Sequence, residues 1–294
     1  MEATSRQAML AEATSGMDSG GGLAKALMLA ADDGRLHSIA AHLIQRGPCV
    51  RRQELAWSSV ELTSAHAAVL AEHSMAALEC GAGSPAPSAH VHRFVVREGT
   101  TVAAELAAAA CAARSDSGAS GLGAWHSTVD LFAWETPAAT KLRAAALAAS
   151  EAAAHAEGGE TAGHPDASAT RSWVNCWAPG SSHPCHDHQD VDRAGVFYVQ
   201  VPESEERATD DGTSAVGSGA LLLHGAGPGP RIAARGTPNS PAPYAALTPT
   251  PGEIIVFPGW LPHGVLPLRL KPTAPQTGDA ALRISAAFNF VMRQ

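Results

Sequence analysis

The stretch that decides the fold runs from residue 183 to residue 201 and reads His-Pro-Cys-His-Asp-His-Gln-Asp-Val-Asp-Arg-Ala-Gly-Val-Phe-Tyr-Val-Gln-Val. It places a histidine pair, His186 and His188, just before an apolar run with the composition of a buried strand. A third histidine, His263, follows the apolar run 254–257 much later in the chain. Short strands that bring distant histidines together are typical of a jelly-roll barrel that holds a metal ion.

The chain from residue 172 onward supports this fold, because short apolar runs alternate there with turn-rich segments, as they do in an all-β barrel. The runs lie at 173–177, 195–201, 220–224, 253–257 and 282–291. Segments 203–217 and 225–251 are polar or rich in Gly and Pro, and loops of this length are expected to line an active-site mouth. The predicted fold class is α+β with a mainly β core: a double-stranded β-helix (jelly roll) with flanking helices.

The first part of the chain is predicted to be different. Residues 1–88 form a helical, flexible N-terminal extension, and residues 89–294 form the main domain. Within the extension we expect helices at 23–31, 36–44 and 63–80, which pack on the main domain, mediate assembly or recruit a substrate. Within 89–170 we expect a strand at 92–96, Ala-rich helices at 101–113 and 138–154 and a polar surface loop at 157–169, before the barrel at 171–294.

Composition restricts the class of protein. Hydrophobic residues make up 45% of the 294 residues, which is enough for a sizeable core. The formal net charge of −8, without a run of Lys or Arg, argues against a general nucleic-acid or anionic-membrane binder. Five widely spaced cysteines without a CxxC pair favour a reducing compartment. No early apolar stretch is long enough for a signal peptide or a membrane span, so we expect a soluble, cytoplasmic protein.

The metal hypothesis follows from strand geometry, because residues i and i+2 of a strand point to the same face. His186 and His188 can therefore reach one metal ion, with His263 as the third ligand. Non-haem iron sites more often combine two histidines with one carboxylate. A shifted register would supply a carboxylate here, since His188 and Asp190 are also two potential metal ligands spaced two residues apart. The sequence leaves both ligand sets open, and an ordinary polar loop containing these histidines is the alternative to any metal.

A cationic anchor follows the third histidine. Arg283 and Ser285 share one face of the strand-like run that ends at Phe290, by the same two-residue period. The planar guanidinium of an arginine pairs well with a carboxylate, and a serine hydroxyl adds a hydrogen bond. In an iron enzyme the natural dicarboxylate is 2-oxoglutarate, with its far carboxylate on Arg283 and Ser285. The simpler alternative is a surface arginine that pairs with an acidic residue.

These motifs, in this order, resemble the 2-oxoglutarate/Fe(II)-dependent oxygenase family. The resemblance covers about residues 90–294 and rests on the phrases at 124–127, 172–175, 179–180, 186–188, 194–199, 218–220, 257–263 and 283–290. It implies a double-stranded β-helix with Fe(II) on His186, His188 and His263. It also implies 2-oxoglutarate at Arg283, with Asn175 as a further cosubstrate contact. The chain departs from the family in having Gln189-Asp190 after the histidine pair, which keeps Asp190 open as a ligand.

The expected activity is that of a dioxygenase that uses Fe(II), 2-oxoglutarate and O2, hydroxylates a substrate and releases succinate and CO2. One alternative is a cupin-like metalloenzyme that binds metal through the same histidines and has no use for Arg283. Another is a non-catalytic, metal-stabilised barrel that binds a partner. The sequence does not say whether the substrate is a small molecule or a protein, nor what the oligomeric state is, since one fold serves many chemistries.

Overall fold

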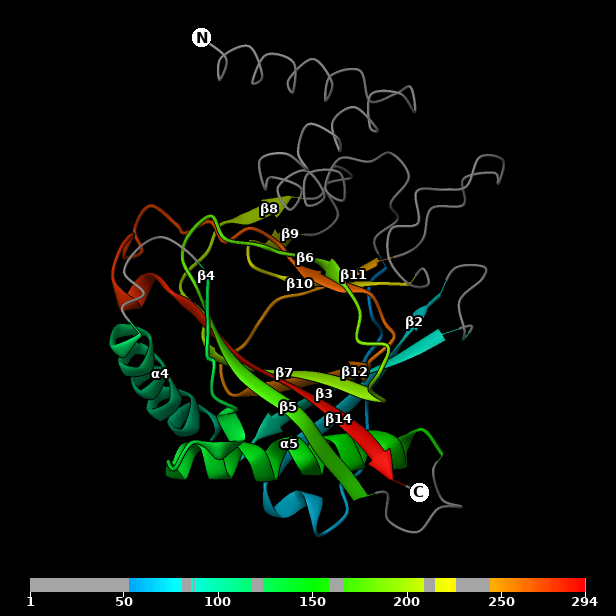
Figure 1. The fold of residues 1–294 in the computed structure, drawn as a ribbon. Helices are drawn as coiled ribbons and strands as arrows, with labels where there is room; N and C mark the ends of the chain where they lie inside the picture. Colours follow the sequence, from blue (N-terminus) through cyan, green and yellow to red (C-terminus); the bar gives the residue numbers. More distant parts are fainter. Residues whose placement is uncertain are drawn as a thin grey trace.

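The computed structural model describes residues 53–80, 86, 88–117, 124–158, 166–208, 215–225 and 244–293. Two antiparallel sheets face each other, and two helices cover the outside of the larger one (Figure 1). The large sheet has the order β1(Ser58–Ser59), β2(Leu70–Glu79), β3(Ser88–Val96), β12(Glu253–Pro258), β7(Arg193–Gln200), β14(Arg283–Arg293), β5(Asp166–Trp177), β4(Ala124–His126). The small sheet has the order β11(Tyr244–Leu247), β10(Leu221–His224), β13(His263–Val265), β6(His183–His186).

The order of the strands identifies the barrel. Along the chain, β5, β6 and β7 alternate between the large and the small sheet, and so do β12, β13 and β14, while β10 and β11 are neighbours in the small sheet. Eight strands thus wind as two antiparallel four-stranded layers, which is the double-stranded β-helix that the sequence predicts. A separate short pair, β8(Glu206–Ala208) and β9(Ala215–Gly217), lies within the predicted loop 203–217.

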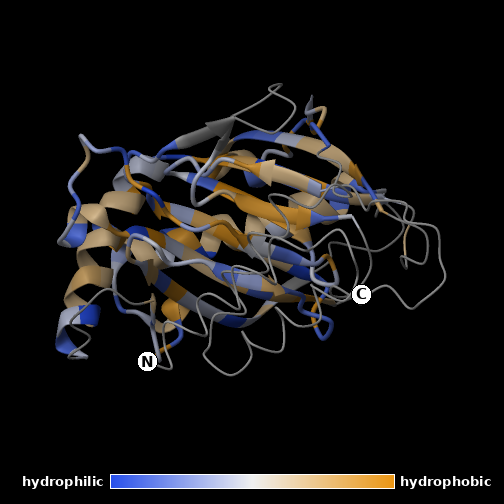
Figure 2. Cartoon of the chain, turned by 90° about the horizontal axis from the view of Figure 1, so that it is seen from above, coloured by the Kyte–Doolittle hydropathy of each residue, from blue (hydrophilic) through white to orange (hydrophobic). Residues whose placement is uncertain are grey.

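The large sheet is buried on both faces, which explains its nearly continuous apolar strands. Along β14, Ile284, Ala286 and Phe288 belong to the core formed with the helices, whereas Arg283 and Ser285 face the small sheet. Figure 2 shows hydrophobic residues concentrated along these strands. Polar side chains on the inner face of so apolar a strand need a partner inside the barrel.

Both predicted helices are present. Helix α4(Gly99–Asp116) and helix α5(Pro137–Ala156) bury small alanine faces on the sheet. Helix α5 begins where Thr136 accepts a hydrogen bond from the Ala139 amide at 3.1 Å, with Pro137 at the first helical position. In the part of the chain that the structure describes, no helix is long and apolar enough to cross a membrane.

One predicted helix is wrong. Residues 70–79 of the expected helix 63–80 form strand β2, and β1 precedes it, so the large sheet begins inside the segment assigned to the extension. The alanines of this run favour a helix locally, but pairing with β3 along its whole length overrides that preference. The expected helices at 23–31 and 36–44 lie outside the described residues.

The predicted surface loop at 157–169 is also wrong in part, because Glu157 is the centre of a polar network on the helix side of the sheet and residues 166–169 begin β5. His92 Nε2 donates to the Glu157 carboxylate at 2.7 Å, and Arg193 donates to both of its oxygens, at 2.5 and 2.8 Å. His73 Nε2 in turn lies 3.1 Å from His92 Nδ1. Because the proton of His92 is on Nε2, where it is donated to Glu157, the Nδ1 atom of His92 has no proton and accepts a hydrogen bond from His73 Nε2.

This network predicts a loss of stability in mild acid. Burial, followed by the nearby His92 and His66, lowers the pKa of His73 from 6.5 to about 4. A folded-state pKa below the unfolded one means that the unfolded chain binds more protons, so stability is full above about pH 6.5 and falls as the pH approaches 4. We expect the free energy of unfolding to fall less steeply between pH 7 and 4.5 in His73→Phe than in the wild type, with urea unfolding as the measurement. Equal slopes would contradict a buried neutral His73.

Candidate metal centre and cosubstrate pocket

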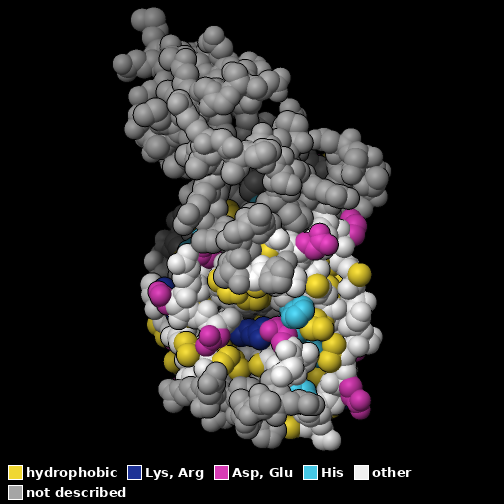
Figure 3. Space-filling model, turned by 90° about the vertical axis from the view of Figure 1, so that its right-hand side faces the viewer, with side chains coloured by type: hydrophobic (Ala, Val, Ile, Leu, Met, Phe, Trp, Pro, Cys, Tyr) yellow, Lys and Arg dark blue, Asp and Glu magenta, His cyan; other side chains and the backbone are white. Residues whose placement is uncertain are grey.

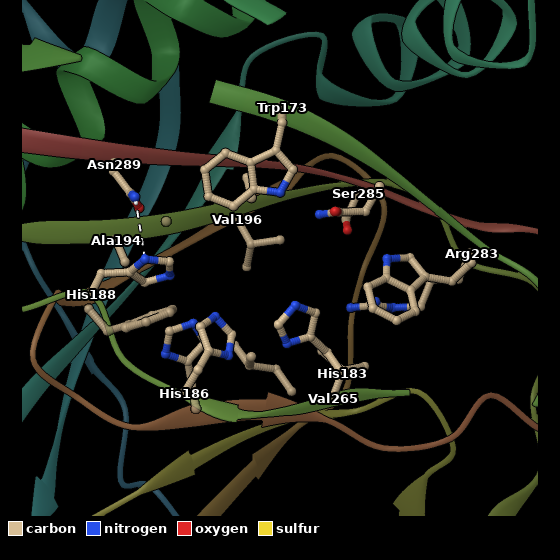
Figure 4. Close-up of a pocket in the computed structure, with 17 residues that line it drawn as sticks. Trp173, His183, His186, His188, Ala194, Val196, Val265, Arg283, Ser285 and Asn289 are labelled. Atoms are coloured by element: carbon tan, nitrogen blue, oxygen red, sulfur yellow. Dashed lines mark hydrogen bonds between the residues drawn. The ribbon is translucent and has the colours of Figure 1, made fainter. Parts of the chain in front are cut away.

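The structure brings the three predicted histidines together inside the barrel. One ring nitrogen from each of His186, His188 and His263 lies within 4.8 Å of the other two. His186 ends β6 and pairs across the small sheet with His263, the first residue of β13. Their ring centroids are 4.3 Å apart, and the ring of His188 is 5.0 Å from that of His186 (Figure 4). Two adjacent strands and one loop therefore direct imidazoles at a common point.

The loop that carries His188 is fixed by the end of β12. The His188 amide donates to the Gly259 carbonyl at 2.8 Å, and the Gly259 amide donates to the Asp192 carbonyl at 3.0 Å. A Cβ at position 259 would come within 2.2 Å of the Val191 carbonyl oxygen and 2.7 Å of that of His188. Glycine is therefore required for this close approach, and the approach holds His188 beside the other two rings.

Hydrogen bonds orient two of the imidazoles for metal binding. Nδ1 of His186 donates to the Pro184 carbonyl at 3.0 Å, and Nδ1 of His263 donates to the Leu261 carbonyl at 2.9 Å. A proton fixed on Nδ1 leaves the lone pair of Nε2 free for a metal. Burial, followed by neighbouring His186, lowers the pKa of His263 well below 6.5 and that of His188 to about 4. The imidazoles of His188 and His263 are thus neutral at physiological pH, as ligation requires.

His188 has a side-chain partner that the sequence did not suggest. The carboxamide of Asn289, on β14, lies 3.4 Å from His188 Nδ1. The two ends of a carboxamide are interchangeable in such a position, and its oxygen can accept the Nδ1 proton. In that orientation Asn289 leaves Nε2 of His188 free, as the backbone carbonyls do for the other two rings.

The shifted ligand set receives no support from the geometry. The side chain of Asp190 is exposed, and it is not a member of the cluster that the three histidines form. Among the described residues, no other group of three or more His, Cys, Asp or Glu side chains has a geometry suited to a metal ion.

A second polar centre lies at the deep end of the same cavity. Arg283 is only 2% exposed, its Nε has no hydrogen-bond partner, and within the described ranges no carboxylate forms an ion pair with it. Its guanidinium lies 5.6 Å from the ring centre of Tyr198. Ser285 is two residues further along β14 on the same face and is equally buried.

Trp177 Nε1 and Asn175 Oδ1 are buried without a hydrogen-bond partner in the part of the chain that the structure describes. Each such atom is unfavourable unless a ligand satisfies it. The Tyr198 hydroxyl is also buried, and the Tyr198 side chain interacts with that of Arg283. Burial raises the pKa of Tyr198 to about 12, so its hydroxyl stays protonated and can donate. A buried guanidinium surrounded by a phenol, an indole and a serine hydroxyl matches the hydrogen-bonding needs of a carboxylate.

The histidines and Arg283 face one cavity of about 550 Å³, including its open mouth. Its walls between the two polar centres are mostly apolar and are formed by Ala194, Val196, Leu221, Phe257, Val265 and Ala287. Figure 4 shows the histidine group at one end and Arg283 with Ser285 at the other. His183, a fourth histidine, lies between them, with its ring 4.3 Å from that of His186.

The donor set fits the metal that the sequence implies. Imidazole nitrogens suit Fe(II) as well as other first-row metals, and three protein ligands leave positions for a cosubstrate and oxygen. The buried, unpaired Arg283 fits a dicarboxylate that reaches from the metal to the deep end of the cavity.

Comparison with known proteins supports the same assignment. Residues 171–289 match the family model described as "Putative 2OG-Fe(II) oxygenase". None of the curated proteins compared with the chain matches it.

Solved structures of low identity are also similar. An oxidoreductase of the 2OG-Fe(II) oxygenase family from Burkholderia pseudomallei has 15% identity and a TM-score of 0.32; the match covers 54% of this chain and 60% of that one. A Pseudomonas putida prolyl-4-hydroxylase has 19% identity and a TM-score of 0.40, over 66% and 88% of the two chains. A viral collagen prolyl hydroxylase from Paramecium bursaria Chlorella virus-1 has 12% identity and a TM-score of 0.39, over 68% and 94%.

The matched segment contains six of the eight barrel strands in full and most of the other two, β5 and β14, with the three histidines and Arg283. Over residues 171–289 the chain is therefore similar to the 2OG-Fe(II) oxygenases, a family of oxidoreductases that use Fe(II) and 2-oxoglutarate.

Proposed function

We propose that the chain is a dioxygenase that hydroxylates its substrate and releases succinate and CO2 from 2-oxoglutarate. The observation that carries the proposal is the pairing of two centres in one cavity: three clustered histidines at one end, and at the other a buried arginine without an ion-pair partner among the described residues. A protein that only bound metal would need the first centre and not the second.

In this proposal His186, His188 and His263 hold Fe(II) through their free Nε2 atoms. Arg283 and Ser285 hold the far carboxylate of 2-oxoglutarate, and Asn175 lies opposite Ser285 on the paired strand β5. The Tyr198 hydroxyl, which interacts with Arg283, and Trp177 Nε1 add two buried donors for this carboxylate. The bound iron, with 2-oxoglutarate and O2, supplies the oxidative decarboxylation and the transfer of an oxygen atom to a C–H bond.

The contribution of the chain's own residues is positioning. The carbonyls of Pro184 and Leu261 hold two imidazoles in the ligating tautomer, and the apolar walls exclude water from the reacting centre. The cupin-like alternative is less well supported, because it gives no reason for Arg283 to be buried without a partner, an arrangement that costs several kcal/mol in general.

The test is a titration of 2-oxoglutarate into anaerobic protein that holds Fe(II), with detection of a visible metal-to-ligand charge-transfer band. We expect a saturable band, and release of one succinate per 2-oxoglutarate consumed once oxygen and a substrate are supplied. The absence of a band from protein shown to contain iron would rule out the proposal in favour of a metal site without 2-oxoglutarate.

The choice of ligand set has its own test. We expect Asp190→Asn to leave Fe(II) affinity unchanged, because its carboxylate is exposed and outside the histidine cluster. His186→Ala removes one of three ligands and should weaken metal binding by well over tenfold. Competition against a chromogenic chelator measures both. A loss of metal in Asp190→Asn with retention in His186→Ala would establish the shifted register instead.

A further inference from the structure

Strand β5 lines the cavity from its mouth to its deep end. Trp173, Asn175 and Trp177 line it, and Arg171, which lies on the same face of the strand by the two-residue spacing, stands just outside this lining. Arg171 is exposed and Trp173 is half-buried, whereas Asn175 and Trp177 are buried. Arg171 pairs with Asn289 on β14, beside His188, and Trp177 pairs with Arg283. Position along β5 therefore corresponds to depth in the cavity.

One arginine, Arg283, thus lines the deep end of the cavity, and a second, Arg171, lies beside Trp173 at its mouth. The proposed function assigns the deep end to 2-oxoglutarate, and the present inference rests on that assignment. The primary substrate must then approach from the open end, past Arg171 and Trp173. The indole of Trp173 has its ring centre 6.3 Å from that of His188, so a molecule lying on Trp173 is next to the metal group.

Arg171 is held in a position suited to binding at this entrance. Its Cζ lies 5.3 Å from the ring centre of Trp173, within the range of a cation–π contact. A guanidinium ordered on an indole keeps the N–H donors at its edge free for a planar acceptor. Within the described part of the chain, no carboxylate pairs with Arg171, and the nearby Asp187 receives its hydrogen bond from Gln189.

The charge around the entrance does not oppose an anion. Three neutral imidazoles leave the full dipositive charge on the metal, which the two negative charges of 2-oxoglutarate offset. Arg283 and Arg171 then leave an excess of positive charge in the cavity. Figure 3 shows the right-hand side of Figure 1, where a basic side chain lies among hydrophobic, acidic and histidine side chains on the surface.

We propose that the primary substrate carries an anionic group, a carboxylate or a phosphate, which Arg171 binds at the mouth while the adjoining part of the substrate lies on Trp173. Arg171 is then a specificity-determining residue. The guanidinium holds the anion at the rim, and the indole directs the carbon to be oxidised toward the histidine group.

The test uses small fluorinated probes and the full chain loaded with Co(II), in the presence of saturating 2-oxoglutarate to fill the deep end. The probes are 4-fluorophenylacetate, its neutral amide, and 4-fluorophenyl phosphate. Paramagnetic broadening of the fluorine signal reports on binding near the metal. We expect saturable broadening by at least one anion and at least fivefold weaker binding of the amide. Comparison of the carboxylate with the phosphate shows which anion the site takes.

Two variants decide whether Arg171 is the cause. Arg171→Gln should weaken binding of the anion by at least fivefold and leave binding of the amide unchanged. Arg93→Gln is the matched control, because Arg93 also stacks on a tryptophan, Trp57, at 4.4 Å, but belongs to strand β3, none of whose residues lines the cavity. This substitution should change the binding of neither probe.

The proposal is overturned if no anion broadens saturably, if the amide binds as well as the acids, or if Arg171→Gln leaves the anion unaffected. Binding of Co(II) and of 2-oxoglutarate is measured separately by absorbance and calorimetry. If Co(II) or 2-oxoglutarate does not bind, the proposed function is contradicted. If both bind and only the fluorine experiment fails, the anion site at Arg171 is contradicted.

Discussion

Replacement of Arg283 by Gln is expected to weaken 2-oxoglutarate binding by about 100-fold. The guanidinium is 2% exposed and has no ion-pair partner among the described residues, so the incoming carboxylate meets a charge that is already desolvated. Loss of one partner of such a buried pair costs about 3 kcal/mol, which corresponds to this change in affinity. Calorimetry with protein that holds Mn(II) or anaerobic Fe(II) measures it. An affinity within threefold of wild type would contradict the role of Arg283.

Metal binding provides the internal control, since Arg283 does not belong to the histidine cluster. Affinity for the metal should be the same in Arg283→Gln and wild type. Lysine should not restore 2-oxoglutarate binding fully, because an ammonium lacks the planar pair of donors.

The same burial has a consequence for stability. In the ligand-free protein the charge of Arg283 is desolvated without compensation, so an apolar residue of similar length removes an unfavourable interaction. Arg283→Met should therefore melt at or above the temperature of the ligand-free wild type. Added 2-oxoglutarate and metal should raise the Tm of the wild type and leave that of the variant near its value with metal alone. A large destabilisation of Arg283→Met would mean that the arginine has a structural partner.

The barrel was predictable because its sequence signals are local and periodic. Each predicted apolar run after residue 172 forms a strand, and the two-residue period of Arg283 and Ser285 places both on the inner face. The histidine pair was predictable by spacing, although His188 reaches the cluster from a loop fixed by Gly259 and not from the strand itself. Spacing along the chain identified the ligands without giving the contact that positions them.

Other features depend on contacts between distant segments. Strand β2 has the alanine content of a helix, and only its pairing with β3 makes it a strand. Tyr198 and Trp177 lie in runs that the sequence identifies only as apolar strands, and the folded structure brings both residues next to Arg283 with their polar atoms buried. The two-residue alternation of side chains along β7 and β5 could have indicated that these two residues face the inside of the barrel. Glu157 gave no signal at all, because its partners His92 and Arg193 are 65 and 36 residues away.

Glu157 is the site of the second large effect that we expect. Burial raises the pKa of its carboxyl, but the hydrogen bonds from His92 and Arg193 and their charges outweigh burial and lower the pKa to about 2. The ionised form therefore stabilises the fold above about pH 4.5, and this stability is lost as the pH falls toward 2. Replacement by Gln leaves Arg193, which is 8% exposed, without its bidentate acceptor.

Glu157→Gln should lower the free energy of unfolding by about 2–3 kcal/mol at pH 7, less than the roughly 3–5 kcal/mol for removing one partner of a fully buried ion pair, because the Glu157 side chain is 23% exposed. Urea unfolding followed by circular dichroism measures the change. Glu98→Gln is the matched control, because Glu98 pairs with Lys141 at 2.7 Å on the exposed surface. An exposed pair contributes little, so this variant should unfold like the wild type.

A double variant separates the loss of the pair from the exposure of an uncompensated charge. If the cost of Glu157→Gln comes from an unpaired Arg193, then adding Arg193→Met should recover part of the lost stability, because the buried charge disappears with it. If the carboxylate acts mainly through His92, the second substitution should add its own loss to the first. The network connects the end of α5 to β3 and β7, on the side of the sheet away from the metal centre. The sign of the coupling energy thus shows whether Arg193 or His92 determines its stability.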